Sequence, residues 1–385
     1  MKPSASNHRF PKTIVMARSI PPAVTGSSII VGNLAKQFSR DEMIVIGAWD
    51  PGTPRVAWSK AWPRLRYPVL WSIRWRGERW IRRAQLPWLV LFTTWIVLTR
   101  RVKAIIAVYP GDIYLLAAYL VARLTGRDLY GYFHNTYLEN NQTALARWLQ
   151  PRVFAYAKHT FVMSEGMERL YNQNYPELVC SPLKHTFNDE LPPVEDPPLH
   201  DPVRLCFSGT LNQSCADAAS RMAQMVQEVD GVALQIFTGT PLPAVEKLGF
   251  TGSKVTVGTV SRDELIDRLR DSDILLLPHG FTSTFAQEEI LTIFPTKVIE
   301  YLISGRPILA HMPPDCFLAE FLRRHDCALI VDEPDVTSLK HSLDRLCNDA
   351  ALRSRLVHNA RAAAKQFEAP TVAAYLRDVI THHSG

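Results

Sequence analysis

The sequence has few cysteines, and they form no ligand pattern. Its six cysteines include no CxxC pair and no Cys/His spacing typical of a metal site. The first residues also lack the charged region, apolar region and cleavage site of a signal peptide. These absences argue against a disulfide-rich secreted scaffold or a zinc-ribbon protein. We therefore expect a reduced protein of the cytoplasm.

Acidic residues are nearly missing from one region. Between Arg55 and Lys103 there are twelve Lys and Arg residues and a single acid, Glu78, so this region carries the formal excess of +6. No nucleic-acid-binding motif accompanies the charge, and we expect no nucleic-acid partner. The same region contains 16 uncharged residues, Ala84–Thr99. This run is shorter than the roughly 20 residues that span a bilayer.

What the sequence does have is a regular alternation of apolar, β-rich runs with helical patterns. A chain of 385 residues, 47% of them hydrophobic, is long enough for two domains. Expected strands of the first domain are 13–17, 43–48, 104–108, 129–133 and 160–163, with helices at 27–38, 71–99, 113–125, 143–157 and 165–174. Expected strands of the second are 204–207, 232–237, 254–257, 274–277, 307–310 and 328–331. The alternation predicts an α/β protein with two doubly wound parallel sheets.

The stretch NDELPPVEDPPLHDP, residues 188–202, separates the two series. It holds five prolines and five acids with little periodicity, as expected of a linker. We therefore expect an N-terminal domain at 1–187 and a C-terminal domain at 203–367. The final helical segment, 368–385, is expected to pack back toward the N-terminal domain. Ligands of such sheets bind beyond the carboxyl ends of the strands, so we expect the site in a central cleft between the domains.

The segment FPTKVIEYLISGRPILA, residues 294–310, carries the clearest local signals. Pro295 suits the first position of a helix, and Gly305 suits the left-handed residue that ends it. The start of a helix favours an anion such as phosphate, to which Thr296 adds a hydroxyl and Lys297 a charge. Glu300 follows one turn later, where a carboxylate would accept hydrogen bonds from ribose hydroxyls. The alternative is an exposed Lys297–Glu300 ion pair with no binding role.

The segment resembles the signature of retaining glycosyltransferases of the GT-B fold, family-4 type, which have FPSK-like residues, a Glu-Tyr pair and a small-Gly-basic-Pro turn. Four further segments are similar to that family in the same order along the chain. They are SIPPAVTGSSIIVGNLAKQF (19–38), HTFVMSEGMERLY (159–171), LCFSGTLNQS (205–214) and VTVGTVSRDELIDRLRDSDILLLP (255–278). The resemblance implies two Rossmann-like domains that face a central cleft, with the acceptor bound by 1–187 and the nucleotide sugar by 203–367. It also implies a hexosyl transfer that needs no metal or other cofactor beyond the nucleotide sugar.

The resemblance also implies roles for individual residues. Thr296 and Lys297 would hold the diphosphate, Lys297 would stabilise charge on the leaving group, and Glu300 would bind the ribose. The remaining candidate donor-binding residues are Gly26, Ser27, Gly209, Thr210, Gly258 and Val260. Four of them have a structural alternative. Thr25 or Ser27 could simply cap a helix, and Gly209 and Thr210 could form an ordinary turn.

His134, in YGYFHNTY, ends an expected strand and resembles the family histidine that reaches the sugar or the acceptor. The alternative is a satisfied structural histidine. The sequence shows no protein nucleophile, and the resemblance implies front-face attack in which the departing phosphate helps to deprotonate the acceptor.

The chain departs from the family at two points. Many members have a glutamate eight residues before the ribose-binding one, where this chain has Thr292; Glu288 or Glu289 would have to substitute, or this branch would manage without it. The loop after Gly209 reads TLNQS and lacks the Arg or Lys that often grips the diphosphate. Lys297 would then carry a larger share of the phosphate charge.

The sequence Asp271-Ser272-Asp273 matches an Asp-x-Asp pattern that can hold a metal beneath a sugar nucleotide. Here it lies between an expected helix and the apolar strand ILLL. This position fits a helix end and a strand start, and we expect no metal role.

The cationic, Trp-rich segment 71–101 suggests an acceptor at a membrane. A helix with Arg and Trp flanks can lie at the interface of an anionic membrane. The alternatives are a core helix at 86–98 and, on charge alone, nucleic acid. We expect a peripheral enzyme at the inner face of the membrane.

These observations predict transfer of a sugar from a nucleotide-diphosphate donor to a lipid-linked or saccharide acceptor, with retention of configuration, in surface polysaccharide or glycolipid assembly. A catalytically weak nucleotide-sugar-binding or scaffolding subunit is the alternative. An epimerase of the same fold is a more distant one.

Overall fold

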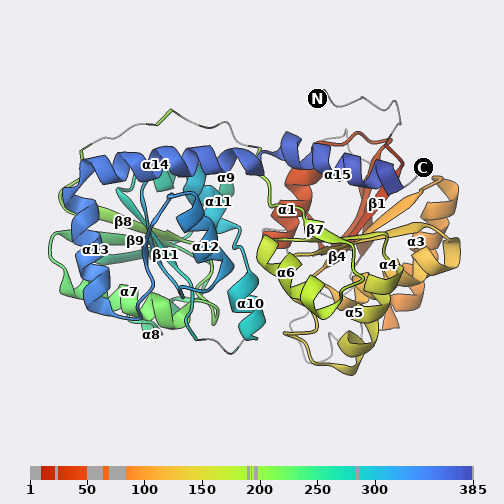
Figure 1. The fold of residues 1–385 in the computed structure, drawn as a ribbon, viewed down its shortest axis with the longest axis horizontal. Helices are drawn as coiled ribbons and strands as arrows, with labels where there is room; N and C mark the ends of the chain where they lie inside the picture. The colour runs from red at the N-terminus through yellow and green to blue at the C-terminus, as the bar shows by residue number, and fades with distance from the viewer. Residues whose placement is uncertain are drawn as a thin grey trace. The chain divides into compact units, whose positions relative to one another are not determined.

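The computed structural model describes residues 10–21, 25–49, 64–68, 84–188, 191, 193–194, 198–282, 284 and 286–383, with the backbone alone at 49, 64–68, 262 and 263. The chain forms two compact units (Figure 1). The first comprises 1–188 and 368–385, and the second comprises 189–367.

The first unit is built on a parallel sheet in the order β3-β2-β1-β4-β5-β6-β7. Its strands are β1 (Thr13–Ser19), β2 (Met43–Trp49), β3 (Arg64–Pro68), β4 (Ala104–Tyr109), β5 (Asp128–Phe133), β6 (His159–Val162) and β7 (Cys180–Pro182). Its helices are α1 (Gly26–Ala35), α3 (Leu86–Thr99), α4 (Asp112–Thr125), α5 (Ala144–Tyr156), α6 (Glu165–Asn174) and α15 (Ala369–His383). The strand order reverses between β1 and β4, which is where such sheets bind ligands.

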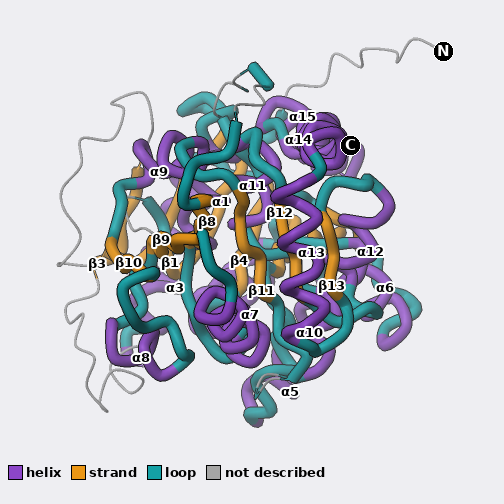
Figure 2. The backbone as a smooth tube through the Cα atoms, turned by 90° about the vertical axis from the view of Figure 1, so that its left-hand side faces the viewer, coloured by secondary structure: helices purple, strands orange, loops and turns teal. Residues whose placement is uncertain are grey.

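The second unit repeats this plan in the order β10-β9-β8-β11-β12-β13, and Figure 2 shows these strands side by side. Its strands are β8 (Val203–Ser208), β9 (Val232–Phe237), β10 (Val255–Gly258), β11 (Ile274–Pro278), β12 (Ile308–His311) and β13 (Leu329–Val331). Its helices are α7 (Ala216–Glu228), α8 (Leu242–Lys247), α9 (Arg262–Arg270), α10 (Gln287–Thr292), α11 (Lys297–Ser304), α12 (Phe317–Arg324), α13 (Val336–Asn348) and α14 (Ala350–Ala364), followed by the 3-10 turn Lys365–Phe367. Here the order reverses between β8 and β11.

Helices cover both faces of the second sheet. α11 packs against α9 and α14, whereas α7 packs against α13 (Figure 1). The β11 residues are buried along their whole length, as expected for a central parallel strand covered on both faces. The prediction of two Rossmann-like parallel sheets is confirmed; the central cleft between the domains stays a prediction.

Besides shifts of one or two residues at the ends of several elements, the predictions differ from the structure at three points. The strands β3 and β7 were not expected. The second half of the expected helix at 71–99 corresponds to α3, which begins at Leu86. Residues 71–83 lie outside the described residues. The first helix ends at Ala35 rather than at 38. Lys36 is its C-cap, and the N–H groups of Gln37 and Phe38 donate to carbonyls three residues back, which forms a turn.

The C-terminal helix α15 belongs to the first unit. Its apolar residues, including Val372 and Leu376, join the buried core of that unit. Arg377 pairs with the carboxylate of Glu42 and donates to the carbonyl of Gln37 at 3.0 Å. Its guanidinium carbon lies 4.3 Å from the ring centroid of Phe38, so the same cation also makes a cation–π contact.

The Glu42–Arg377 pair makes the stability of the first unit depend on pH. The hydrogen bond from Arg377 lowers the pKa of Glu42 to about 2 from 4.5. The folded state therefore favours the carboxylate, so its contribution is present above pH 4.5 and is lost as the pH falls toward 2. We expect Glu42→Gln to lower the free energy of unfolding, measured by urea denaturation, by about 1 kcal/mol at pH 7. The difference from the wild type should become smaller as the pH falls below 4.5. The exposed neighbour Asp41→Asn is the control; an equal loss there would contradict the assignment.

Candidate functional site

The N-terminal end of α11 lies at the carboxyl edge of the second sheet and holds Thr296, Lys297 and Glu300. The helix ends at Gly305, whose φ of 79° is the predicted left-handed conformation. The prediction for Pro295 is wrong. Regular α-helix begins at Lys297, and the preceding turn is tightened by hydrogen bonds from Val298 N–H to the Pro295 carbonyl and from Ile299 N–H to the Thr296 carbonyl.

Lys297 extends from this helix over the end of β8. Its Nζ lies 4.4 Å from the ring centroid of Phe207. Gly209, with φ of 111°, has no side chain to block it: a Cβ there would lie 3.2 Å from Cε and 3.5 Å from Nζ of Lys297. Gly209 thus has a role beyond an ordinary turn, because its missing side chain makes room for the lysine.

The side chain of Lys297 is half-buried. Burial lowers its pKa, although Cys215 and Glu300 favour the charged form. Lys297 and Glu300 are both half-buried rather than exposed, so the predicted alternative of an exposed surface pair is wrong. A desolvated cation beside helix N–H groups is a suitable site for a phosphate.

Tyr301 fixes the position of α11, and the sequence indicated it only as the second member of the Glu-Tyr pair. Its fully buried hydroxyl accepts a hydrogen bond from Ser208 N–H at 2.8 Å and donates to the carbonyl of Leu276 at 3.2 Å. These bonds tie the helix to the end of β8 and to the middle of β11. Glu300, the preceding residue, is therefore held at a fixed place beside the strand ends.

The other donor-binding candidates of this unit follow the neighbouring strand ends. Gly209 N–H donates to the Phe237 carbonyl at 2.9 Å, and Thr238 N–H donates to the Gly258 carbonyl at 2.9 Å. The ends of β8, β9 and β10 are therefore adjacent. Thr210 and Gly258 are exposed and Val260 is half-buried, so backbone groups are accessible along this edge.

A charged network that sequence reasoning missed supports the loop after β11. Asp217 Oδ2 accepts hydrogen bonds from Arg221 at 3.0 Å and from Phe281 N–H at 3.2 Å. Arg221 Nε donates to Nε2 of the fully buried His311 at 2.8 Å. Burial lowers the pKa of His311 to about 4, so its ring is neutral and can accept this bond. Arg221 is thereby used within the fold rather than replacing the Arg that the loop 210–214 lacks.

His279 joins this network to α10, and its N–H donates to the His311 carbonyl at 2.9 Å. Its ring contacts the Ile290 carbonyl through Nε2 at 2.8 Å, and it is 2% exposed. Burial, followed by the nearby Lys297, lowers its pKa despite opposing effects of that hydrogen bond and Asp217. Thr292, at the position of the absent glutamate, donates its hydroxyl to the Glu288 carbonyl at 2.7 Å. Of the two candidate substitutes, Glu288 is exposed and Glu289 is buried.

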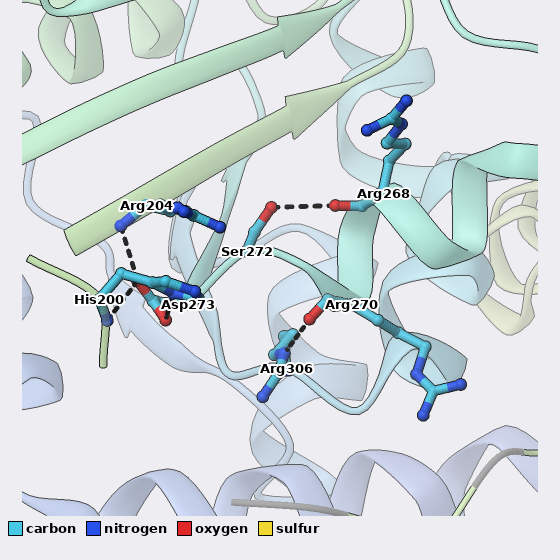
Figure 3. Close-up of polar contacts among 7 residues, drawn as sticks. All are labelled: His200, Arg204, Arg268, Arg270, Ser272, Asp273 and Arg306. Atoms are coloured by element: carbon cyan, nitrogen blue, oxygen red, sulfur yellow. Dashed lines mark hydrogen bonds and ion pairs between the residues drawn. The ribbon is translucent and has the colours of Figure 1, made fainter. Parts of the chain in front are cut away.

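The Asp271-Ser272-Asp273 segment has a structural role at the opposite, amino edge of the sheet (Figure 3). Asp273 is 3% exposed and accepts hydrogen bonds from Arg204 N–H at 2.7 Å and from the backbone N–H of His200 at 3.2 Å. Ser272 donates to the Arg268 carbonyl at 3.1 Å. The carboxylate therefore fastens the end of the linker to the start of β8. Among the described residues, no cluster of His, Cys, Asp and Glu side chains could hold a metal.

In the first unit, Gly26 and Ser27 begin α1 and follow a capping residue. Thr25 accepts a hydrogen bond from Ser28 N–H at 3.3 Å, so the predicted alternative of a cap is confirmed for Thr25. Ser27 is half-buried and Gly26 is exposed. Their N–H groups belong to the first turn of the helix, where an α-helix has no internal acceptors.

His134 lies one residue beyond β5, at the carboxyl edge of the first sheet. Its N–H donates to the Tyr109 carbonyl at 2.9 Å, and its ring meets that of Tyr132 edge-on at 4.3 Å. It is 5% exposed, and neither ring nitrogen has a hydrogen-bond partner in the described part of the chain. His134 is therefore not the hydrogen-bonded structural histidine that was the alternative prediction.

Comparison with known proteins bears on the second unit directly. Residues 244–363 match the family described as Glycosyl transferases group 1. No curated protein matches the sequence significantly.

Solved structures match nearly the whole chain. Sucrose-phosphate synthase from Thermosynechococcus elongatus has a TM-score of 0.73 at 14% identity, over 96% of this chain and 97% of that one. HepE from Anabaena, in complex with UDP and glucose, has a TM-score of 0.70 at 15% identity, over 96% and 98%. The lipopolysaccharide outer core galactosyltransferase WaaB has a TM-score of 0.64 at 12% identity, over 96% and 99%.

The chain has the GT-B fold. The predicted resemblance to GT-B glycosyltransferases is thereby confirmed, and the group 1 glycosyl transferase match includes Lys297, Glu300, Gly258 and Val260. A solved structure described as a putative UDP-N-acetylglucosamine 2-epimerase, from Listeria monocytogenes, also matches, with a TM-score of 0.60 at 10% identity over 95% of this chain and 94% of that one. Fold alone therefore does not separate transfer from epimerisation.

The contact between Gly209 and Lys297 can be tested by adding one methyl group. We expect Gly209→Ala to displace the lysine and to weaken nucleotide-sugar binding by about tenfold, since a charge-assisted contact contributes roughly 1.5–3 kcal/mol. Gly231→Ala is a matched control, because Gly231 also has a positive φ, of 70°, but no atom within 4 Å of the added Cβ. Calorimetry with a panel of nucleotide sugars measures the effect. An equal loss of affinity in both variants would show that backbone strain alone causes the effect.

The environment of His134 predicts its protonation state. Burial lowers its pKa to about 3, so the ring is neutral over the working pH range and cannot supply a cation. We expect His134→Asn to lower kcat/KM by a similar factor at every pH from about 5 to about 9, leaving the pH profile unmoved. If the pH profile of kcat/KM for the wild type bends near pH 6.5 and this bend is absent from the variant, His134 titrates during turnover.

Proposed function

We propose that this protein is a glycosyltransferase that moves a hexose from a nucleotide-diphosphate donor to a lipid-linked or saccharide acceptor, with retention of configuration, in surface polysaccharide or glycolipid assembly. The observation that carries the proposal is the desolvated Lys297 ammonium at the tip of α11, which lies so close to Gly209 that a Cβ there would be 3.5 Å from Nζ. The complexes of HepE with UDP-glucose and with UDP and glucose support a UDP-sugar as the first donor to test.

In this proposal the second unit binds the donor. The diphosphate lies against the N–H groups at the tip of α11, Thr296 donates its hydroxyl, and Lys297 neutralises charge. Glu300 accepts hydrogen bonds from the ribose hydroxyls. Backbone groups around Gly258 and Val260 contact the base, and Gly209 and Thr210 border the diphosphate.

Transfer proceeds by front-face attack. The acceptor hydroxyl approaches from the side of the departing phosphate, which takes its proton, and Lys297 stabilises the charge that grows on that phosphate. Gly26 and Ser27 offer N–H groups to the donor, and the neutral His134 offers a ring nitrogen to the sugar or acceptor. This scheme requires no metal and no protein nucleophile.

The charge on Lys297 is tested by Lys297→Met, which keeps the apolar stem. We expect the variant to lose roughly 10- to 100-fold in UDP-glucose affinity and about 100-fold or more in kcat. Glu300→Ala should weaken donor binding about tenfold through the ribose. Lys340→Met is the matched control, because Lys340 pairs with Glu228 at 3.1 Å between two exposed helix surfaces. Calorimetry across a panel of nucleotide sugars, followed by assays of hydrolysis and transfer, measures both effects.

A nucleotide-sugar-binding subunit without activity is the second candidate. It is favoured by Thr292, which occupies the position of a family glutamate and whose hydroxyl is bonded to the Glu288 carbonyl. Donor binding that depends on Lys297 and Glu300, with no hydrolysis or transfer for any sugar in the panel, would support it over the enzyme.

A further inference from the structure

Helix α3 exposes large apolar side chains to solvent, although its other face is packed into the protein. Thr93 is fully buried, and its hydroxyl has no hydrogen-bond partner among the described residues. Four large apolar side chains face outward instead, and their exposed fractions are Trp88 60%, Leu91 65%, Trp95 59% and Leu98 57%. A helix on the surface of a soluble domain normally presents charged or polar side chains to solvent.

The exposed residues form one continuous face. At about 100° per residue, positions 88, 91, 95 and 98 fall within an arc of roughly 80°. The buried residues of the helix, Leu89, Val90, Thr93, Ile96 and Val97, lie on the opposite side, and the apolar ones join the core of the first unit. We call the four exposed residues the α3 face. Scattered exposed apolar residues are common, but a contiguous stripe of four marks an interaction surface.

Cations gather at the C-terminal end of the same helix. Arg100, Arg101 and Lys103 follow α3 directly, and all three are exposed. Helix α4, which packs against α3, ends at the same edge of the sheet, where Arg123 and Leu124 are exposed. α3 itself contains no acidic residue.

This combination fits one partner, the surface of an anionic bilayer. Tryptophan combines an apolar ring with an N–H donor and suits the headgroup region, while Arg and Lys nearby attract anionic lipid. The opposite side of α3 is packed into the protein, so lipid can contact only the α3 face. No helix in the described part of the chain is long and apolar enough to cross a membrane.

We propose that the α3 face, Trp88, Leu91, Trp95 and Leu98, is a monotopic membrane-docking surface, oriented by the cations at its C-terminal end. This narrows the sequence-based prediction, which assigned the membrane contact to the whole segment 71–101, to the helical part of that segment. The arginines at 74, 76, 79, 82 and 83 lie outside the described residues. Docking itself does not depend on the proposed function; only its use, to bring a lipid-linked acceptor to the enzyme, rests on it.

The test compares two double variants of the full chain. Leu91→Gln/Leu98→Gln removes half of the α3 face. Val179→Gln/Leu242→Gln is the matched control, because these residues are similarly exposed, at 53% and 52%, but lie elsewhere. Sedimentation with phosphatidylcholine vesicles containing phosphatidylglycerol should show a loss of about tenfold or more in partitioning for the first variant only. Thermal unfolding followed by circular dichroism verifies that both variants fold.

The charge component has its own comparison. We expect Arg100→Gln/Lys103→Gln to bind phosphatidylcholine vesicles as the wild type does but to lose the preference for phosphatidylglycerol. Equal wild-type binding with and without phosphatidylglycerol would overturn this component.

Two results would overturn the docking proposal. One is unchanged vesicle binding in the Leu91→Gln/Leu98→Gln variant. The other is a wild type that ignores vesicles and forms a dimer that this variant abolishes, as measured by analytical ultracentrifugation, which would assign the α3 face to a second copy of the chain. Because these measurements use neither donor nor acceptor, failure of the proposed glycosyl transfer would leave their outcome unaffected.

Discussion

The close approach of the Lys297 side chain to the backbone of Gly209 is the constraint on which the candidate site depends. Partial removal of the Lys297 ammonium from water is unfavourable in free energy, and it occurs at the carboxyl edge of β8. Two features make the position possible. Gly209 contributes no Cβ, and Tyr301 holds α11 in place by bonding to Ser208 N–H and the Leu276 carbonyl.

Local signals in the sequence predicted the elements near this contact well. Apolar runs indicated the central strands because buried parallel strands must be apolar on both faces. Gly305 indicated the end of α11 because only glycine adopts φ near 79° at little cost. The start of the helix was misjudged. Pro295 fits the first helical position in general, but here its carbonyl already accepts Val298 N–H in a tight opening turn.

The features that the sequence did not predict depend on contacts between distant residues. The strands β3 and β7 are short and carry charged or proline residues, so pairing with β2 and β6 defines them rather than an apolar pattern. The hydrogen bonds of Tyr301 and the Asp217–Arg221–His311 network join residues up to 93 positions apart. For α3, a uniformly apolar sequence cannot indicate which face will be buried.

The electrostatics of the second unit explain why Lys297, rather than another cation at this edge, is suited to bind an anion. Arg221 is neutralised by Asp217 and bonded to His311, so its charge is already compensated within the fold. Lys297 has an aromatic ring and a glycine beside its ammonium but forms no salt bridge with the described residues. A diphosphate at the tip of α11 would add to the nearby negative charge of Glu300 and offset the desolvation of the ammonium. The same desolvation that lowers the pKa of Lys297 in the absence of ligand therefore strengthens its attraction for a phosphate, because the interaction is little screened by water.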